Sequence, residues 1–268
     1  MTGRAALLTG GGSGFGAEVA RQLARRGDRV VLVDVAEEAG RAVAEEVGGH
    51  FLRADVSVFD EVVESTRRAE ELFGGLELVF LNAGVITGCG IGDDFDVLRY
   101  RRAMGVNLDG VVYGVHAALP ALRRRGGGSI VATASLAGLT AVPFDPVYGA
   151  NKHAVVGLVR ALGPALEADG IRVNAFCPGF AETAILHGIR GALDASGVPV
   201  IPVDVAGRAV LQVFDSPDTG QAWLLQAGHD AAPYRFRGVP GPRTETGEKV
   251  QLADPRGVPA AGAEPPPQ

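Results

Sequence analysis

The stretch Ala5-Ala-Leu-Leu-Thr-Gly-Gly-Gly-Ser-Gly-Phe-Gly-Ala-Glu18 joins a short apolar run to a loop of closely spaced glycines. Glycine tolerates positive φ and lets a ligand approach the backbone closely. A loop of bare N–H groups that leads into a helix N-terminus suits a pyrophosphate. The loop lacks the Gly-Lys-Ser/Thr ending of nucleoside-triphosphatases. It therefore predicts a dinucleotide site, with a purely structural turn as the alternative.

An acidic residue, Asp34, ends the next apolar run, 18 residues beyond Gly16. A carboxylate at about this distance can accept hydrogen bonds from the adenosine ribose hydroxyls, and it would repel a 2′-phosphate. No arginine or lysine occupies residues 10–16 or 35–40, and Arg41 is expected to be solvated. The pattern therefore favours NAD over NADP.

Apolar runs of strand length alternate with amphipathic stretches of helix length over most of the chain. Continuous apolar runs are typical of strands that are buried on both faces, and the alternation implies right-handed βαβ units. The expected strands are Ala5–Thr9, Val30–Val33, His50–Ala54, Leu76–Leu81, Ser129–Thr133, Ile171–Phe176 and Ala222–Gln226, and the clearest helices are Ala17–Arg26, Glu37–Val47 and Val58–Phe73. We predict an α/β fold, a doubly wound parallel sheet of seven strands with helices on both faces, in one domain over residues 1–230.

Residues 231–268 differ from the rest, because 13 of these 38 positions are Pro or Gly. This share exceeds the ~25–30% that marks low-complexity sequence. We expect an irregular tail that is disordered in part, above all at its final Glu264-Pro-Pro-Pro-Gln268. The segment Pro233-Tyr-Arg-Phe-Arg237 carries two aromatic residues that could pack on the domain or on a neighbouring subunit. The alternative, which we favour, is an irregular surface strap.

Composition excludes several classes of protein. The 268 residues carry 31 acidic and 25 basic side chains, a net charge of −6, so nucleic acid is not an expected partner. Cys89 and Cys177 cannot build a disulfide framework, which favours a reduced, cytoplasmic setting. No window approaches the ~18 apolar residues of a membrane span. The five histidines show no ligand spacing, so no metal is expected.

Tyr148 and Lys152 lie four residues apart in a helical segment that Asp145 can cap and Pro146 can begin. Residues at this spacing share one face of a helix. A lysine charge near a phenol lowers its pKa from about 10, which makes tyrosine a usable acid and base. Taken alone, such a pair is common by chance and is more often a surface contact.

Further motifs follow the glycine loop in a fixed order. They are Thr9-Gly10-x3-Gly14-x-Gly16, Asn82-Ala83-Gly84, Asn107 in Gly-Val-Asn-Leu, Ser135 in Thr-Ala-Ser-Leu, Tyr148-x3-Lys152 and Cys177-Pro178-Gly179-Phe-Ala-Glu-Thr183. With this set, residues 4–228 resemble the short-chain dehydrogenase/reductase family. The runs Ser135–Leu139 and Asn174–Phe180 are similar in particular to the NAD-dependent 15-hydroxyprostaglandin dehydrogenases. A shared motif does not fix the substrate.

The resemblance implies a Rossmann fold and NAD-dependent interconversion of a secondary alcohol and a ketone. It implies that Tyr148 is the acid/base, that Lys152 lowers its pKa and binds the nicotinamide ribose, that Ser135 orients the substrate oxygen, and that Asn107 holds a helix kink and a relay water. Cofactor contacts are implied for Gly10, Ser13, Gly14, Phe15, Gly16, Asp34, Val35, Asp55, Val56, Asn82, Ala83, Gly84, Tyr148, Lys152, Pro178, Gly179, Ala181 and Thr183.

Departures from the family pattern concern the oligomer more than the chemistry. Leu81 stands where the family has a further asparagine, and Pro164 should kink or end the Tyr-Lys helix. In the family this helix packs against its copy, so the resemblance implies a homodimer or homotetramer. The tail beyond Gly228 has no counterpart in the family.

Apolar residues around the site favour a small hydrophobic substrate, similar to a lipid, a steroid or a polycycle. Segment 184–203 is expected to cover it, and the pocket residues expected are Val142, Phe144, Leu186 and Ile189. The same apolar residues could instead pack the core. Two other functions remain open, a ketoreductase of a biosynthetic pathway and an NAD-binding sensor or scaffold without turnover. Asp34 weighs against the first, because cellular reductions usually draw on NADPH, and the intact catalytic set weighs against the second.

Overall fold

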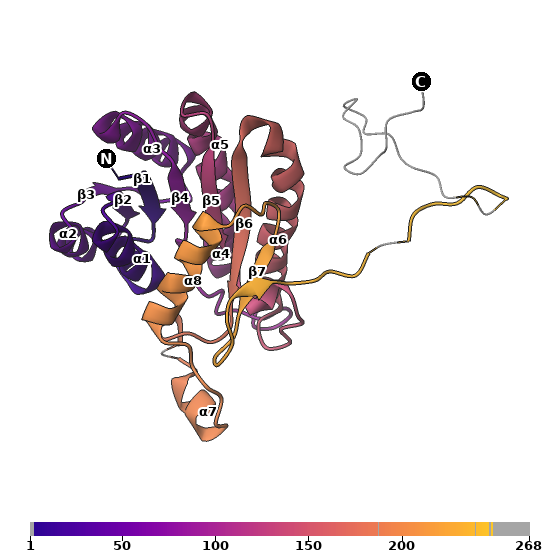
Figure 1. Ribbon diagram of the computed structural model, residues 1–268. Coiled ribbons are helices and arrows are strands. Elements are labelled where there is room, and N and C mark those ends of the chain that lie inside the picture. Colours follow the sequence, from indigo (N-terminus) through magenta and orange to yellow (C-terminus); the bar gives the residue numbers. More distant parts are fainter. Residues whose placement is uncertain (1–2, 187, 239, 247, 249–268) are drawn as a thin grey trace. The chain divides into compact units, whose positions relative to one another are not determined.

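The structure is a computed structural model that describes residues 3–186, 188–238, 240–246 and 248. Contacts divide the chain into two units, one of residues up to Tyr234 and one from Arg235 onward. The first unit holds the sheet and the helices (Figure 1). In the second, a turn is closed by the Thr244 N–H, which donates to the carbonyl of Glu248. The disorder expected for Glu264–Gln268 concerns residues outside those described.

One sheet of eight strands forms the centre of the first unit, in the order β3-β2-β1-β4-β5-β6-β7-β8. The strands are β1 (Ala5–Thr9), β2 (Arg29–Asp34), β3 (His50–Arg53), β4 (Leu78–Leu81), β5 (Gly128–Thr133), β6 (Ile171–Pro178), β7 (Ala222–Leu225) and β8 (Ala232–Pro233). The seven strands from β1 to β7 are parallel. The order reverses between β1 and β4, where open α/β sheets bind their ligands.

The eighth strand was not expected from the sequence. β8 pairs with β7 in the antiparallel direction over two residues, Trp223 with Pro233 and Leu224 with Ala232. The Tyr234 N–H extends this pairing by donating to the Ala222 carbonyl at 2.7 Å. A proline is tolerated there because β8 lies at the edge of the sheet and needs no donor on its outer side.

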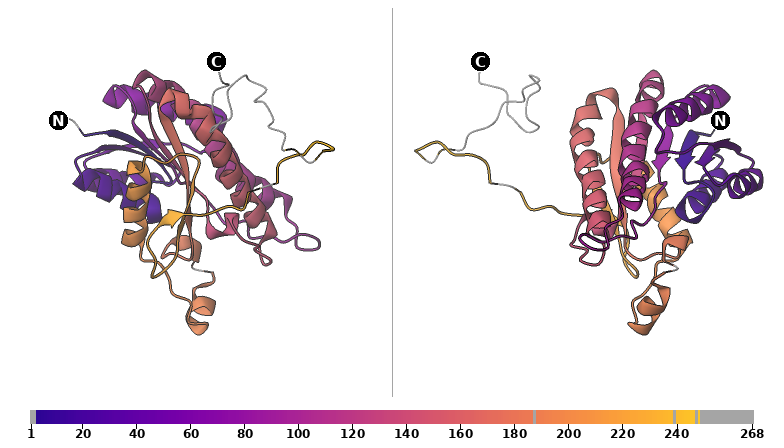
Figure 2. Two further views of the ribbon diagram at one scale, coloured as in Figure 1. Left: turned by 45° about the vertical axis from the view of Figure 1, so that its right-hand side comes forward. Right: turned by 180° about the vertical axis from the view of Figure 1, so that it is seen from behind.

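Helices cover both faces of the sheet (Figures 1 and 2). They are α1 (Gly14–Arg25), α2 (Glu37–Glu46), α3 (Phe59–Phe73), α4 (Val97–Met104), α5 (Gly110–Arg124), α6 (Pro146–Leu166), α7 (Arg190–Ala195) and α8 (Val203–Asp215), with a π-helical turn at Gly105–Asp109 and 3-10 turns at Leu136–Gly138, Glu167–Asp169 and Ala184–Leu186. Helix α6 continues for two residues past Pro164 and then changes into a 3-10 turn, as the missing N–H of proline leads one to expect.

Two hydrophobic clusters fill the two sides of the sheet. Ala5 and Leu7 pack with α3, α5 and α6, whereas Ala6 and Leu8 pack with α1, α2 and α8. Successive residues of a strand point to opposite faces, so a strand covered on both sides must be apolar throughout. This is the physical reason why β1 reads as a continuous apolar run.

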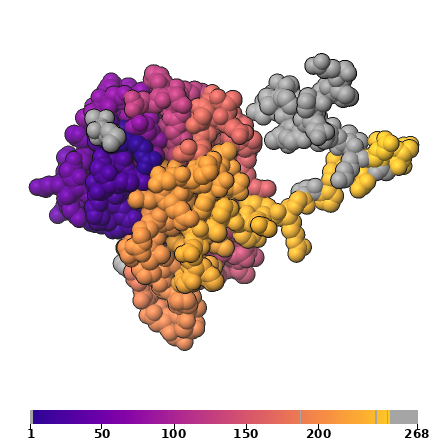
Figure 3. Space-filling model, in the orientation of Figure 1, coloured from indigo at the N-terminus to yellow at the C-terminus, as the bar shows by residue number. Residues whose placement is uncertain are grey.

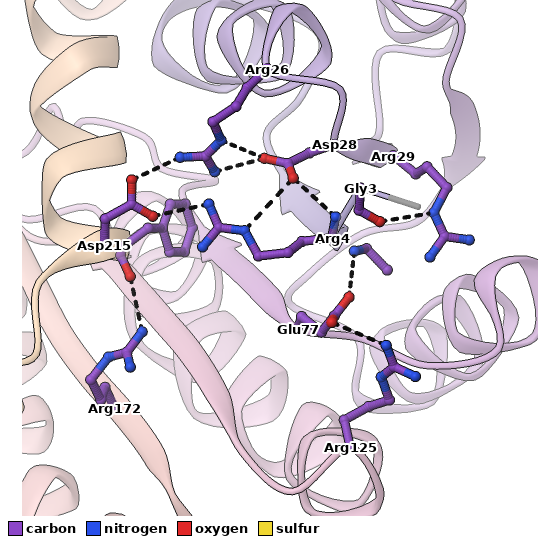
Figure 4. Close-up of polar contacts among 11 residues, drawn as sticks. Gly3, Arg4, Arg26, Asp28, Arg29, Glu77, Arg125, Arg172 and Asp215 are labelled. Atoms are coloured by element: carbon purple, nitrogen blue, oxygen red, sulfur yellow. Dashed lines mark hydrogen bonds and ion pairs between the residues drawn. The ribbon is translucent and has the colours of Figure 1, made fainter. Parts of the chain in front are cut away.

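Charged side chains join the amino ends of the strands, at the edge opposite the glycine loop (Figure 4). The Asp28 carboxylate, only 5% exposed, accepts hydrogen bonds from the Arg4 N–H at 3.0 Å and from Arg26 Nε at 2.7 Å. Both arginines also reach Asp215 at the end of α8. This network ties β1, β2 and α8 together at the edge that carries no candidate site.

Residues 184–186 and 188–202 form an arm that carries α7 away from the body of the first unit (Figure 1; the orange lower part of Figure 3). Two backbone hydrogen bonds hold its base, from Ile201 N to Phe180 O at 2.8 Å and from Glu182 N to Ile201 O at 2.9 Å. Arg190 adds ion pairs to Glu182 and Asp194. The arm stands at the carboxyl edge of the sheet.

Candidate active site

The glycine loop connects β1 to α1 and fits a pyrophosphate. Gly10 and Gly14 have φ values of +65° and +49°, which side chains other than glycine rarely adopt. A Cβ at Gly16 would lie 2.0 Å from the Gly10 carbonyl oxygen. Ser13, the N-cap of α1, makes no side-chain capping hydrogen bond, so the positive end of α1 is open to an anion. Phe15 packs edge-on against Phe176 at 5.7 Å.

Asp34 ends β2 directly beside this loop. Its Oδ2 accepts a hydrogen bond from the Gly12 N–H at 2.9 Å, and its Oδ1 accepts one from the Ala36 N–H at 2.9 Å. These contacts fix the carboxylate, and each oxygen can still accept a second bond. Val35, the next residue, is exposed. The arrangement suits recognition of two neighbouring hydroxyls.

Asn82 holds three strand ends together at the site. Its Nδ2 donates to the carbonyls of Thr9 at 3.2 Å and Gly10 at 3.3 Å, and its Oδ1 accepts from Thr133 Oγ1 at 3.1 Å. The Ala83 N–H donates to Thr9 Oγ1 at 3.2 Å. Asn82 therefore helps to hold the start of the glycine loop in its observed shape.

The other residues expected on the adenosine side lie nearby. Asp55 turns its carboxylate toward the N–H and hydroxyl of Ser57, at 2.9 and 2.7 Å. Val56 is buried under Gly110. At Gly84 an added Cβ would lie 3.4 Å from Asn107 Oδ1 and 3.8 Å from Lys152 Nζ. Gly84 thus lets the backbone pass close to both side chains.

Tyr148 and Lys152 lie on α6, whose start follows from the sequence. Asp145 accepts a hydrogen bond from the Tyr148 N–H at 2.9 Å, and Pro146 begins the helix. Lys152 Nζ lies 5.7 Å from the centre of the Tyr148 ring and donates to the Thr133 carbonyl at 2.8 Å. Ser135, after β5, lies close enough for its hydroxyl to lower the pKa of the phenol. The structure therefore brings these three predicted residues together.

Burial dominates the acid–base properties of this group. Desolvation raises the pKa of Tyr148 above 10, the hydrogen bond from Ser135 opposes the rise, and the Asp145 charge adds to it. Lys152 is 3% exposed, and desolvation lowers its pKa to about 8. Desolvation also raises the pKa of the neighbouring Cys177 thiol to about 12. Cys177 therefore stays a neutral thiol.

Asn107 lies in the π-helical turn between α4 and α5 and is completely buried. Its Nδ2 donates to the Val85 carbonyl at 2.8 Å, and its Oδ1 accepts from the Val85 N–H at 2.8 Å. The expected irregular helix is present. The side chain is used to hold the loop that follows β4 against the site.

The loop after β6 approaches the glycine loop. The Gly179 N–H donates to the Leu225 carbonyl at 2.8 Å, next to Pro178, the last residue of β6. Ala181 forms an isolated bridge with Ile201 at the base of the arm. A Cβ at Gly14 would lie 3.4 Å from Thr183 Cγ2. Thr183 thus faces the start of α1.

A cavity of about 480 Å³ opens beside the start of α6. Its lining residues are Gly88, Cys89, Gly90, Asp94, Asp96, Arg99, Phe144 and Asp145. Of the expected pocket residues, Phe144 lines it and is 76% exposed, and Val142 is half-buried nearby. Ile189 is exposed on the arm. Leu186 is buried, and it lines neither this cavity nor a second cavity that lies beside α7.

Sequence reasoning missed the polar wall of this cavity, residues 88–99. Arg99 donates to the Gly88 carbonyl and lies 3.5 Å from Asp96, which caps α4. The available signal was their position directly after Asn82-Ala83-Gly84, at the carboxyl end of a central strand, where such sheets bind ligands.

The second cavity, of about 520 Å³, lies between the arm and α8.

The described residues offer neither a metal site nor a membrane span. Among the described residues, no group of three or more His, Cys, Asp or Glu side chains could hold a metal ion. Within the same part of the chain, none of the helices is long and apolar enough to cross a membrane.

Comparison with known proteins agrees with this geometry. Residues 4–193 match the family model described as short chain dehydrogenase. The chain is 35% identical to short-chain dehydrogenase reductase 3a of Arabidopsis thaliana over 87% of this chain and 91% of that protein. It is 36% identical to cyclohexanol dehydrogenase of an Acinetobacter species, over 68% and 75%. It is 31% identical to 3-alpha-(or 20-beta)-hydroxysteroid dehydrogenase of Mycobacterium tuberculosis, over 85% and 90%.

A solved structure shows the same fold with a cofactor in place. It is 3-ketoacyl-(acyl-carrier-protein) reductase from Brucella melitensis complexed with NADH, with a TM-score of 0.79 and 29% identity over 84% of this chain and 98% of that one. The family match, the open helix end and the fixed carboxylate agree on a nicotinamide cofactor. The chain belongs to the short-chain dehydrogenase/reductase family of oxidoreductases.

Proposed function

We propose that this protein is an NAD-dependent dehydrogenase that oxidises a hydrophobic secondary alcohol to a ketone. The observation that carries the proposal is the group formed by Ser135, Tyr148 and Lys152. The Ser135 hydroxyl lies near the phenol and lowers its pKa, and the buried ammonium lies 5.7 Å from the ring centre. This group lies at the same sheet edge as the glycine loop.

Each residue has a distinct task in the proposed reaction. Ser135 would hold the substrate oxygen, and Tyr148 Oη would take the hydroxyl proton as hydride leaves the carbinol carbon. The bound nicotinamide would supply the hydride acceptor. Lys152 would favour the phenolate by its positive charge. Asn107, through Val85, would keep the wall of the site in place.

Two features of the adenosine side support NAD. Asp34 places its carboxylate against the glycine loop, where it would repel a 2′-phosphate. The nearby Arg41 is already engaged, because it donates twice to Glu37, at 2.8 and 2.9 Å, and lies 5.5 Å above the Phe51 ring. Its side chain is still 65% exposed, as the sequence predicted. These contacts direct Arg41 toward Glu37 and Phe51, which supports the preference for NAD.

The substrate class is proposed from the apolar side chains around the cavity and the arm. Those exposed there are Ile86, Ile91, Phe95, Leu98, Phe144, Ile185 and Ile189. Exposed apolar groups of this size often mark a binding surface. Two relatives carry names that refer to cyclohexanol and to hydroxysteroids. We therefore propose an alicyclic, lipid-like or steroid-like alcohol.

The proposal includes a homo-oligomer and a reduced, cytoplasmic setting. Ala150, Gly157 and Ala161 are exposed on one side of α6 and leave room for a close neighbour. Cys89 and Cys177 are free. Reduction of a ketone is the second candidate for the physiological direction, since a solved neighbour is a ketoacyl reductase.

The test compares Tyr148→Phe with the wild type on a panel of secondary alcohols, with NAD reduction followed by absorbance. We expect Tyr148→Phe to lower kcat by a factor of ~10²–10⁴ and to bind NADH as the wild type does. Tyr113→Phe, which changes a tyrosine that packs on Phe59 away from the site, is the control. Undiminished turnover by Tyr148→Phe would overturn the mechanism, and NADH binding without turnover of any alcohol or ketone would favour a sensor.

A further inference from the structure

Arg53 is the last residue of β3 and lies directly beside Asp34, the last residue of β2. The register of the two parallel strands pairs Val31 with His50 and ends with Asp34 opposite Arg53. Neighbouring strands are about 4.8 Å apart, and an arginine side chain is longer than this gap. The guanidinium can therefore reach a group that is bound to the Asp34 carboxylate.

The two side chains also lie on the same face of the sheet. Leu32 and Phe51 are opposite one another and both pack in the cluster that includes α1 and α2. Asp34 and Arg53 come two residues later on their strands, so they face the same way. Phe51 confirms the direction, because a Cβ at Gly40 of α2 would lie 2.1 Å from its ring. Gly12 of the glycine loop lies on this side, within hydrogen-bond distance of Asp34.

Arg53 differs from Arg41 in its availability. It is exposed, and among the described residues it makes no hydrogen bond or ion pair. Arg41, on the neighbouring helix α2, is held by Glu37 and covers Phe51. Of these two cations near the adenosine side, Arg53 is the one whose five donors are free for a ligand.

We infer that Arg53 is a second determinant of cofactor choice, a cation that binds a 2′-phosphate and partly offsets the repulsion by Asp34. Arginine suits this task because its planar fork matches the oxygens of a phosphate. The inference rests on the proposed function, since it assumes that the adenosine ribose binds at Asp34. It adds that the protein keeps a measurable affinity for NADP(H), and that this affinity depends on β3 and not on the glycine loop.

Binding of NADH and NADPH by calorimetry gives a test that does not need turnover. The variants are Arg53→Gln, Asp34→Asn and the double variant, with Arg41→Gln as the control. We expect Arg53→Gln to weaken the binding of NADPH about tenfold, which corresponds to the ~1.4 kcal/mol of one charge-assisted contact. The affinity for NADH should change less than twofold. Asp34→Asn should bind NADPH more tightly than the wild type does, and the double variant should lose most of that gain in affinity. Arg41→Gln should resemble the wild type for both cofactors.

Several results would overturn the inference. Equal weakening of NADH and NADPH by Arg53→Gln would make Arg53 a general adenosine contact without selectivity. An Arg41→Gln variant that behaves like Arg53→Gln would show a diffuse charge effect. Equal NADPH affinity of Asp34→Asn and the double variant would remove Arg53 from the site. Failure of the proposed function looks different, because then the wild type would bind neither cofactor or would turn over without Tyr148.

Discussion

Lys152 is a buried cation that the fold holds at a cost in stability. Its side chain is 3% exposed, and its one hydrogen bond to a described residue is to the Thr133 carbonyl. Burial lowers the pKa of Lys152 from 10.5 to about 8. Between these two values the unfolded chain binds more protons at this group than the folded one. The contribution of Lys152 to the free energy of unfolding therefore rises with pH across that window.

We predict that Lys152→Met stabilises the fold near neutral pH while it lowers activity. Removing the penalised charge should raise the free energy of unfolding by roughly 1–3 kcal/mol at pH 7, less the lost hydrogen bond. The gain should shrink as the pH approaches 10, where the wild-type lysine is neutral. Urea unfolding of both proteins at pH 7 and pH 10 measures it. An equal difference at the two pH values would contradict the assigned cause.

The sequence predicted these residues better than it predicted their neighbours. Tyr148 and Lys152 could be paired from their spacing alone, because α6 places them one turn apart. Arg53 could not be placed beside Asp34, since that depends on the register of β2 and β3, which no local pattern reveals. Arg41 is exposed to solvent, as the sequence predicted, but its position over Phe51 was not foreseen.

At the scale of elements, the π-helical turn between α4 and α5 presents Asn107 to the loop after β4. A π-helical turn inserts one residue into the helical ladder and is often found at functional sites. Here both polar atoms of the Asn107 amide bind the Val85 backbone at 2.8 Å. Helix and loop are therefore coupled through a single side chain, and the loop carries one wall of the cavity.

We predict that Asn107→Ala releases this loop and lowers both stability and activity. Loss of the two hydrogen bonds should cost about 1–3 kcal/mol, and kcat/KM should fall more than tenfold as the wall shifts. Asn151→Ala is a matched control, because Asn151 is also buried and binds the same helical stretch through Ala103, but makes no hydrogen bond to the loop. Thermal unfolding and steady-state kinetics of both variants decide the matter. Equal losses of activity in the two variants would mean that Asn107 acts only through the stability of the fold and not through its contact with this loop.

Elements in the interior were predictable, and those at the edges were less so. β1 was predicted at its exact bounds, Ala5–Thr9, because glycines end it and both faces are buried. β6 runs two residues past its prediction, to Pro178, since pairing with β7 extends it. β8 was missed because two residues carry no periodicity, and their pairing depends on an edge that exists only in the folded sheet.

In the whole molecule, the charged network and the candidate site lie at opposite edges of the sheet. The charged network around Asp28 secures the amino ends of the strands (Figure 4), and the candidate site occupies the carboxyl ends. Neither edge includes the outer side of α6, where Ala150, Gly157 and Ala161 are exposed. These positions, seven and eleven residues apart, lie on one face of the helix. That face is where the proposed oligomer would form.

We predict that Gly157→Arg separates the oligomer into monomers without unfolding them. A Cβ at Gly157 meets no atom within 4 Å, and arginine is a better helix former than glycine by ~1 kcal/mol, so the isolated chain accepts it. A second copy of the chain packed closely on α6 would clash with the arginine side chain. Gly191→Arg, at an equally open glycine in α7, is the control. Light scattering after gel filtration should give half the mass or less for Gly157→Arg and the wild-type mass for Gly191→Arg. An unchanged mass for Gly157→Arg would place the contact between subunits elsewhere.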